Sequence, residues 1–342
     1  MRTIRMLAAT AALATTMAVA GVAHAGKDLD AIKARGSLIC GVGPSSAGFY
    51  LLGSDGKWSG IDVDVCRAIA AAILGDSEKV KYVPASAQQR FQQVQSGEVD
   101  ILSRTTTWTL TRDTALGLDF GHITVYDGQG FLVPKKLGIK SAKELKGATV
   151  CVQPGTTTEL NLADFFRANN MDFKSVVIES RDELEQAFYN GRCDTYTNDS
   201  TGLASSRATR APKPDDYVIL PERISKEPLA PAFRHGDNQF GDIVRWSVYA
   251  MLEAEEKGIT SKNVDEMKKS DDPQIKRLLG ITPGMGKALG VDEEWAYRII
   301  KQVGNYGESY DRNLGPNSSV KLDRGLNKLW SDGGIQYAPP VR

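Results

Sequence analysis

The sequence has few of the residues that most catalytic and metal sites require. It contains three histidines and four cysteines in 342 residues. No two cysteines form a Cys-x-x-Cys pair, so the sequence predicts neither a zinc ribbon nor a thioredoxin-like site. The Gly-x-Ser-x-Gly pattern of a nucleophile elbow is also absent, which argues against a Ser-His-Asp hydrolase. We therefore expect no catalytic residue of these classes, no metal and no cofactor.

An excess of positive charge is also absent. The chain has 42 Lys and Arg residues and 42 Asp and Glu residues. The first 25 residues contain Arg2, Arg5 and no acidic residue, so residues 26–342 carry 40 basic and 42 acidic residues, a net charge of −2. Nucleic-acid-binding proteins need basic surfaces, and nothing here favours that class. After residue 25, no apolar run approaches the roughly 18 residues of a membrane-spanning helix.

The one long apolar run lies at the N-terminus. Arg2 and Arg5 precede the apolar stretch 6–23, and Ala23-His24-Ala25 is a small-x-small cleavage site. This order is typical of a secretory signal peptide. We expect residues 1–25 to be removed after Ala25, with no cysteine following to carry a lipid anchor. The mature protein of about 317 residues is then soluble, exported and long enough for two lobes.

Export favours disulfides between the four cysteines, because the compartment is oxidising. Grouping by region pairs Cys40 with Cys66 and Cys151 with Cys193. The sequence alone allows three connectivities, and reduced, buried thiols are the alternative.

Two successive sets of strands and helices are predicted. Alternation of short apolar runs with helical segments is typical of a mostly parallel sheet flanked by helices, the α/β class. The expected strands are residues 37–42, 80–84, 98–103, 148–152, 175–178 and 193–197. The expected helices are residues 29–35, an alanine-rich segment ending near 72, and residues 90–96, 157–169 and 181–190.

The remaining segments divide the chain into two lobes. A strand near 130–134 and the proline-rich return at 221–231 are expected to cross between the lobes and to act as hinges. Lobe 1 would comprise residues 26–132 and 228–342, and lobe 2 residues 133–227. The expected later segments are a strand at 232–235, helices at 240–257, 292–303 and 318–331, and a loop region at 271–290.

A hydroxyl-rich loop leaves the strand at 98–103 and ends on an arginine. Residues 104–112 read Arg-Thr-Thr-Thr-Trp-Thr-Leu-Thr-Arg. Hydroxyls and free backbone N–H groups at a strand end can surround a small anion, and arginine can bind a carboxylate with two parallel hydrogen bonds. The alternative interpretation is a polar surface loop with a solvated arginine.

Two further loops supply complementary chemistry. The Gly-Thr-Thr-Thr turn at 155–158 begins a helix, where N–H groups and the helix dipole favour an anion. Asp199 follows a strand end and can pair with an ammonium group. Taken separately, the Gly-Thr turn can be an ordinary capped helix start, and Asp199 can be an ordinary turn aspartate. In a cleft between two lobes, the three loops together match the zwitterion of an α-amino acid.

These residues carry a resemblance to a known family. Between about residues 37 and 235 the chain resembles the periplasmic amino-acid-binding proteins of ABC transporters, solute-binding family 3. The pattern around 105–113 and residues 90–91 and 305–308 most resemble the general L-amino-acid-binding branch. The matching segments are 60–65, 96–100, 105–112, 152–157 and 191–194, followed by Asp199.

The resemblance implies the two-lobe type II periplasmic binding protein fold, with the ligand in the interlobe cleft. At the matching positions Arg112 would bind the ligand carboxylate, assisted by Thr107 and, from lobe 2, by Thr157. Thr105 would offer an oxygen to the ammonium group, and Asp199 would pair with it.

The chain departs from the family pattern at two positions. Where the family often has an aromatic residue that stacks on the ligand, this chain has Ser46, and Phe49 nearby is the candidate that covers the ligand. Arg104 stands where a small residue is common. The sequence therefore leaves the side-chain pocket and the preferred amino acids undefined.

The resemblance implies a periplasmic monomer that captures free L-amino acids, with broad specificity, and delivers them to a membrane permease. An exported cyclohexadienyl or arogenate dehydratase on the same fold is the alternative. Such an enzyme needs a general acid, and the two mature histidines, His122 and His235, lie in none of the three loops. A sensor domain is less favoured, because no signalling module or spanning segment is attached.

Overall fold

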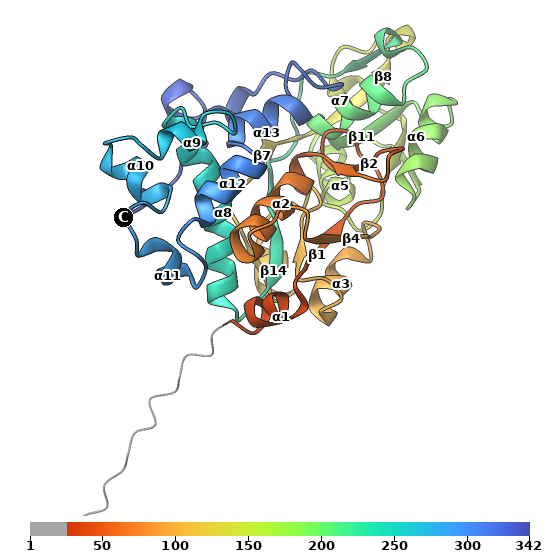
Figure 1. Cartoon of the computed structure of the whole chain (residues 1–342). Helices are drawn as coiled ribbons and strands as arrows, with labels where there is room; N and C mark the ends of the chain where they lie inside the picture. The colour runs from red at the N-terminus through yellow and green to blue at the C-terminus, as the bar shows by residue number, and fades with distance from the viewer. Residues whose placement is uncertain (1–25) are drawn as a thin grey trace, which may run out of the picture.

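The computed structural model describes residues 26–342. The expected signal peptide, residues 1–25, and its cleavage site after Ala25 lie outside the described residues. Two five-stranded sheets, each flanked by helices, form the two lobes of the predicted α/β fold (Figure 1).

The first sheet has the strand order β4-β1-β5-β14-β6. β1 pairs in parallel with β4 and β5, and β14 is antiparallel to β5 and β6. Its strands are β1 (Leu38–Val42), β4 (Val80–Pro84), β5 (Ile101–Leu102), β6 (Leu118–Phe120) and β14 (Ala232–Arg234). Helices of this lobe include α1 (Lys27–Arg35), α2 (Ile61–Leu74), α3 (Arg90–Ser96), α4 (Leu110–Thr114) and α8 (Asn238–Glu256). The alanine-rich α2 is buried along most of its length, because small side chains let it pack between β1, α8 and the later helices.

The second sheet has the order β10-β9-β11-β8-β12. β9 is parallel to β10 and β11, whereas β8 is antiparallel to β11 and β12. Its strands are β8 (Gln129–Pro134), β9 (Thr149–Val152), β10 (Lys174–Val177), β11 (Thr195–Asp199) and β12 (Tyr217–Ile219). Its main helices are α5 (Thr157–Ala168), α6 (Arg181–Tyr189) and α7 (Ser200–Thr209). Phe131, Leu162 and Phe166 form part of the core that joins α5 to the sheet.

Two short antiparallel strands connect the sheets. β7 (Val125–Asp127) pairs with β13 (Glu227–Leu229), and each lies where the chain passes between the two sheets. β8 belongs to the second sheet from Gln129 onward. The division of the chain into residues 26–132 with 228–342 and residues 133–227 stays a prediction.

Both disulfides predicted by region are present. Cys40 of β1 is bonded to Cys66 of α2, and Cys151 of β9 is bonded to Cys193, which precedes β11. No free cysteine is left in the described chain, so the alternative of reduced thiols is wrong. Each disulfide joins elements of one lobe and leaves the connection between the lobes unconstrained.

Removing the second disulfide is expected to destabilise the protein. The bond closes a loop with a sequence separation of 42 residues, and chain-entropy reasoning gives such a cross-link about 4 kcal/mol. Replacing Cys151 and Cys193 together with alanine should lower the free energy of unfolding by an amount of this order. Denaturant unfolding of the oxidised wild type and the double variant measures it. A loss below about 1 kcal/mol would show that this loop-closure term does not apply here.

The C-terminal region contains two expectations that were wrong. Residues 318–331, expected to be helical, contain only short 3-10 turns at Gly325–Asn327 and Trp330–Asp332. Positive φ angles at Lys321 and Gly325 interrupt any longer helix. The expected loop at 271–290 instead contains α10 (Pro273–Leu278) and α11 (Met285–Leu289).

The start of α10 has a clear physical cause. The side chain of Asp272 accepts a hydrogen bond from the Gln274 backbone N–H at 2.7 Å, and Pro273 occupies the first helical position. The other helices of this region are α9 (Val264–Met267), α12 (Trp295–Gln302) and α13 (Tyr306–Asn313).

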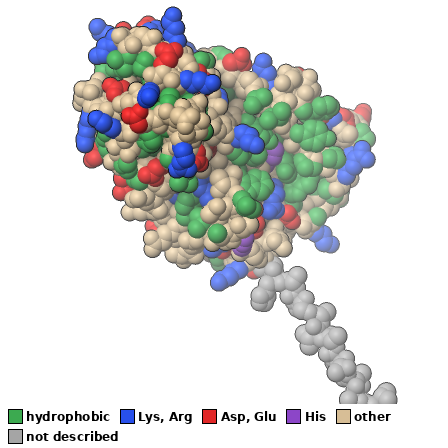
Figure 2. Space-filling model, turned by 180° about the vertical axis from the view of Figure 1, so that it is seen from behind, with side chains coloured by type: hydrophobic (Ala, Val, Ile, Leu, Met, Phe, Trp, Pro, Cys, Tyr) green, Lys and Arg blue, Asp and Glu red, His purple; other side chains and the backbone are tan. Residues whose placement is uncertain are grey.

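The surface mixes both signs of charge. Figure 2 shows Lys and Arg side chains interspersed with Asp and Glu, beside a broader hydrophobic patch on the same face. None of the helices within residues 26–342 combines the length and the apolar character that crossing a bilayer requires.

Candidate ligand-binding site

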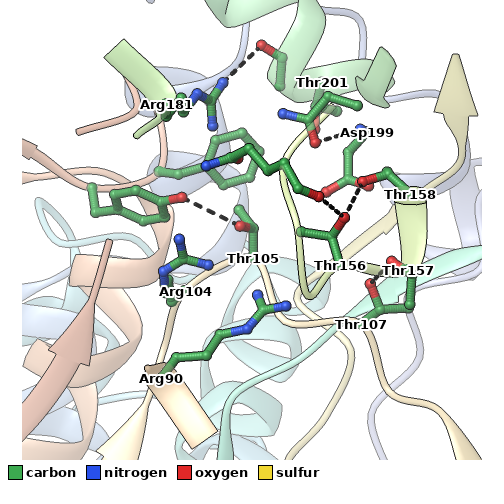
Figure 3. Close-up of a pocket in the computed structure, with 15 residues that line it drawn as sticks. Arg90, Arg104, Thr105, Thr107, Thr156, Thr157, Thr158, Arg181, Asp199 and Thr201 are labelled. Atoms are coloured by element: carbon green, nitrogen blue, oxygen red, sulfur yellow. Dashed lines mark hydrogen bonds between the residues drawn. The ribbon is translucent and has the colours of Figure 1, made fainter. Parts of the chain in front are cut away.

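A cavity lies between the two lobes and contains about 490 Å³ of space free of atoms, part of it open to solvent. It is lined by side chains from both lobes, and most of these side chains are polar (Figure 3). Five of the six predicted ligand residues line it: Phe49, Thr105, Thr107, Thr157 and Asp199. Arg112 does not belong to this lining set.

The loop after β5 is held in place by a buried aspartate. Asp62, in the first turn of α2, accepts hydrogen bonds from the Thr105 backbone N–H at 2.9 Å and from the Ser103 hydroxyl at 3.2 Å. Burial raises the pKa of Asp62 to about 6, although these two hydrogen bonds act in the opposite direction. Thr105 has a φ of 41°, a conformation that non-glycine residues seldom adopt. The Gly-Ile-Asp segment therefore positions the loop that faces the cavity.

The glycine of that segment makes a close approach possible. Gly60 has a φ of 132°, and a Cβ added there would lie 2.1 Å from the Phe49 carbonyl oxygen. Phe49 is buried, and the neighbouring Tyr50 places its hydroxyl 3.4 Å from the Thr105 hydroxyl. The start of α2 thus determines the positions of both the first loop and the threonine loop.

The second lobe contributes the start of α5. Thr156 caps this helix by accepting a hydrogen bond from the Glu159 backbone N–H at 3.1 Å. The Thr157 hydroxyl lies 3.4 Å from the Thr107 hydroxyl of the other lobe. The two threonine loops therefore meet across the cleft, and the N–H groups of a helix N-terminus, which favour an anion, lie beside it.

A buried glutamate missing from the sequence prediction joins these loops. Glu227 of β13 is 1% exposed, and its carboxylate accepts hydrogen bonds from the hydroxyls of Thr107 at 2.6 Å and Thr157 at 2.9 Å. Asn161 donates to the same carboxylate at 2.9 Å. Because both threonine hydroxyls already donate to Glu227, the backbone N–H groups of these residues are the donors that stay free for a ligand.

Arg112 lies behind the threonine loop. Its guanidinium donates to the Thr107 carbonyl oxygen at 2.8 Å and lies over the Phe91 ring, 4.9 Å from the ring centroid. Burial lowers the pKa of Arg112 to about 10, while the charges of Glu227 and Asp199 oppose that shift. The structure therefore places Arg112 as a support for Thr107 and a source of positive charge next to the cavity.

Asp199 is the acidic residue of the cavity lining. It ends β11 and precedes α7. Burial raises its pKa well above the ordinary value of 3.8, and the nearby carboxylates of Asp127 and Glu227 raise it further. A ligand ammonium group beside Asp199 would favour the ionised form of its carboxyl and so lower its pKa again.

Three arginines also line the cavity: Arg90, Arg104 and Arg181. The sequence left the directions of Arg90 and Arg104 undefined and gave no signal for Arg181. One group of potential metal ligands occurs in the described part of the chain, formed by Asp113, Asp119 and His235, and it is no part of the cavity lining.

The chain is similar to several characterised proteins. The family described as bacterial extracellular solute-binding proteins, family 3, matches residues 38–272. A protein of Rhizobium johnstonii named general L-amino acid-binding periplasmic protein AapJ is 54% identical over 96% of this chain and 97% of its own length. The glutamate/glutamine/aspartate/asparagine-binding protein BztA of Rhodobacter capsulatus is 56% identical over 95% of this chain and 96% of its own length.

A solved structure agrees with these sequence similarities. It is an ABC transporter periplasmic binding protein from Brucella ovis with glutathione bound, 54% identical to this chain. It superposes with a TM-score of 0.90 and covers 92% of this chain and 99% of its own.

Proposed function

Because this chain belongs to the bacterial extracellular solute-binding proteins, family 3, we propose that it is a periplasmic protein that captures L-amino acids and delivers them to an ABC-transporter permease. The predicted two-lobe type II periplasmic binding protein fold is confirmed. The observation that carries the proposal is the interlobe cavity, which places an ammonium partner, Asp199, and an anion-favouring helix start in one space.

The α-carboxylate is bound by groups that the protein leaves available. Since Glu227 accepts from the hydroxyls of Thr107 and Thr157, the backbone N–H of Thr107 and those at the start of α5 are the donors for the ligand. Arg112 supplies the positive charge from behind Thr107 and holds the backbone of that residue through its carbonyl oxygen. The α-ammonium pairs with Asp199 and with an oxygen of Thr105.

Closure of the lobes is part of the mechanism. In this structure the Ser205 hydroxyl of lobe 2 donates to the Ala47 carbonyl of lobe 1 at 2.8 Å, and Arg210 lies 3.2 Å from the Ser45 hydroxyl. Such contacts exist only when the lobes are together. Ligand would first settle on lobe 1, and rotation about β7 and β13 would then bring α5 and Asp199 across it.

The dehydratase alternative has less support. The described histidines, His122 and His235, do not line the cavity, and the relatives reported above are named as binding proteins. Asp199 has the raised pKa of a proton donor, so incubation with prephenate or arogenate, followed by product analysis, is the direct test.

The zwitterion contacts predict broad specificity. Every L-amino acid presents the same carboxylate and ammonium, so we expect several of different charge to bind, with affinities within about two to three orders of magnitude, or roughly 3–4 kcal/mol. A thermal-shift panel followed by calorimetry measures this range. D-Amino acids, and analogues lacking either charged group, should bind far more weakly, because a buried charge would be left unpaired. Stabilisation by a single amino acid would contradict broad specificity. Glutathione belongs in the panel because it is bound to the Brucella relative.

A further inference from the structure

We propose that the end of the cleft opposite Asp199 is a binding site for a second carboxylate, formed by Arg90 and Arg104, so that dicarboxylic L-amino acids bind best. This inference rests on the proposed function and extends it to the side chain of the ligand. Figure 3 shows Arg104 and Asp199 on opposite sides of the cavity, with Arg90 pointing into it from a third direction.

Arg104 is buried but incompletely bonded. It is 5% exposed, and its Nε donates to the Ala85 carbonyl oxygen at 3.0 Å. This bond orients the guanidinium and leaves its two terminal nitrogens without a hydrogen-bond acceptor among residues 26–342. Tyr50, whose ring centroid lies 6.0 Å from the guanidinium, provides an aromatic face beside it. Because Arg104 lines the cavity, these terminal nitrogens are donors available to a ligand there.

Arg90 forms even weaker hydrogen bonds than Arg104. It is 3% exposed, and its Nε is buried with no hydrogen-bond partner in the described chain. One terminal nitrogen lies 3.5 Å from the Gly155 carbonyl oxygen, at the limit of a hydrogen bond. No carboxylate of the described residues forms an ion pair with either Arg90 or Arg104.

The third arginine of the cavity, Arg181, differs because its guanidinium is both hydrogen-bonded and ion-paired. Arg181 donates from Nε to Glu185 at 2.9 Å and from a terminal nitrogen to the Gly202 carbonyl at 3.1 Å. Its charge is neutralised within lobe 2. The unpaired positive charge of the cavity therefore comes from Arg90 and Arg104.

Burying two guanidinium groups that form no ion pair is costly, because charged groups in protein interiors are normally paired; Asp199, and for Arg104 also Asp62, offset this cost only from a distance. Burial lowers the pKa of both arginines, and their mutual repulsion lowers that of Arg90 further. The only carboxylate of the lining set, Asp199, is committed to the ligand ammonium. A ligand with a second carboxylate would supply the negative charge that Arg90 and Arg104 lack. A neutral side chain would leave both arginines unpaired, and a basic side chain would be repelled by them.

Calorimetry with matched ligand pairs tests the site. L-Glutamate and L-glutamine differ only at the side-chain terminus, as do L-aspartate and L-asparagine. The wild type should bind each acid at least about tenfold more tightly than its amide, which is about 1.4 kcal/mol. In Arg104→Gln this preference should fall below about threefold, chiefly through weaker binding of the acid, while Arg104→Lys should retain part of it.

Two controls separate the site from general effects. Arg167→Gln removes one positive charge from an exposed position of α5, where Arg167 forms an ion pair with Asp164, and should leave the acid-to-amide ratio unchanged. Ligand-free Arg104→Gln should melt no lower than the wild type, because it removes a buried guanidinium that forms no ion pair with a described residue. Should Arg104→Gln fail to fold, Arg90→Gln provides the same comparison of acid with amide.

The outcomes distinguish this inference from the function on which it rests. Equal binding of acid and amide by the wild type, or equal weakening of both in Arg104→Gln, would overturn the second carboxylate site and leave amino-acid binding intact. Failure of every L-amino acid to bind the wild type would overturn the proposed function, and this inference with it.

Discussion

Arg112→Ala is expected to weaken binding of every L-amino acid by roughly thirtyfold or more, because truncating one member of a desolvated charge pair costs on the order of 2–5 kcal/mol. The variant loses the positive charge next to the ligand carboxylate. It also loses the hydrogen bond that holds the Thr107 carbonyl at 2.8 Å, so the N–H of that residue is less well placed. Calorimetry with L-glutamate and one neutral amino acid measures the loss.

The loss should be independent of the ligand side chain, because Arg112 acts on the shared carboxylate. Arg112→Lys keeps the charge but not the planar fork or the contact with Phe91, so we expect it to restore only part of the affinity. Arg245→Ala is a matched control: Arg245 also lies over a phenylalanine ring, that of Phe233 at 5.7 Å, but in α8 and away from the cavity. Unchanged affinity in a folded Arg112→Ala protein would remove Arg112 from the site.

The parts of the site that the sequence could predict are local. Thr105 and Thr107 directly follow a strand, Thr157 begins a helix, and Asp199 ends a strand, so each position can be recognised from a few neighbouring residues. Parallel strands bring their carboxyl ends to one edge of a sheet, and this places such residues close together. The family resemblance then orders them into a single site. The structure brings all four to one cavity.

The contacts that the sequence could not predict are long-range. Glu227 lies 120 residues from Thr107 and 70 from Thr157, and it reaches both because β13 crosses between the lobes. Nothing in its Lys-Glu-Pro surroundings marks it as buried. Arg90 begins a short helix, and its inward direction depends on how α3 packs on the sheet rather than on its own sequence.

The C-terminal errors have a different origin. The segment 271–290 has weak periodicity, and the structure forms helices there because Asp272 and Pro273 start one and tertiary packing buries Ile275 and Leu278. Residues 318–331 were expected to be helical, but positive φ at Lys321 and Gly325 prevents a continuous helix there. Backbone conformations of this kind are set by contacts that periodicity does not contain.

Asp199→Asn is expected to produce a comparable loss of affinity, roughly thirtyfold or more, because the ligand ammonium would lose its charged partner in a desolvated cleft. This substitution preserves the size of the side chain and removes one of three neighbouring carboxylates that repel one another, so the variant should fold. Asp164→Asn, at an exposed position of α5, is the control for the change in net charge. Retention of wild-type affinity in Asp199→Asn would show that another group binds the ammonium.

Asp199 should also make the affinity for amino acids depend on pH. In the free protein burial, followed by repulsion from Asp127 and Glu227, raises the pKa of Asp199 well above 3.8, so its carboxyl binds a proton more readily than an exposed aspartate. A bound ammonium favours the ionised form and lowers this pKa, and binding must therefore release a proton between the bound and free pKa values. Affinity should accordingly fall, by up to about tenfold per pH unit, as the pH drops through the pKa of the free protein. Calorimetry in buffers of different ionisation enthalpy measures the proton release. It should disappear in Asp199→Asn and persist in Asp164→Asn, whereas equal release in both variants would assign the proton to another group.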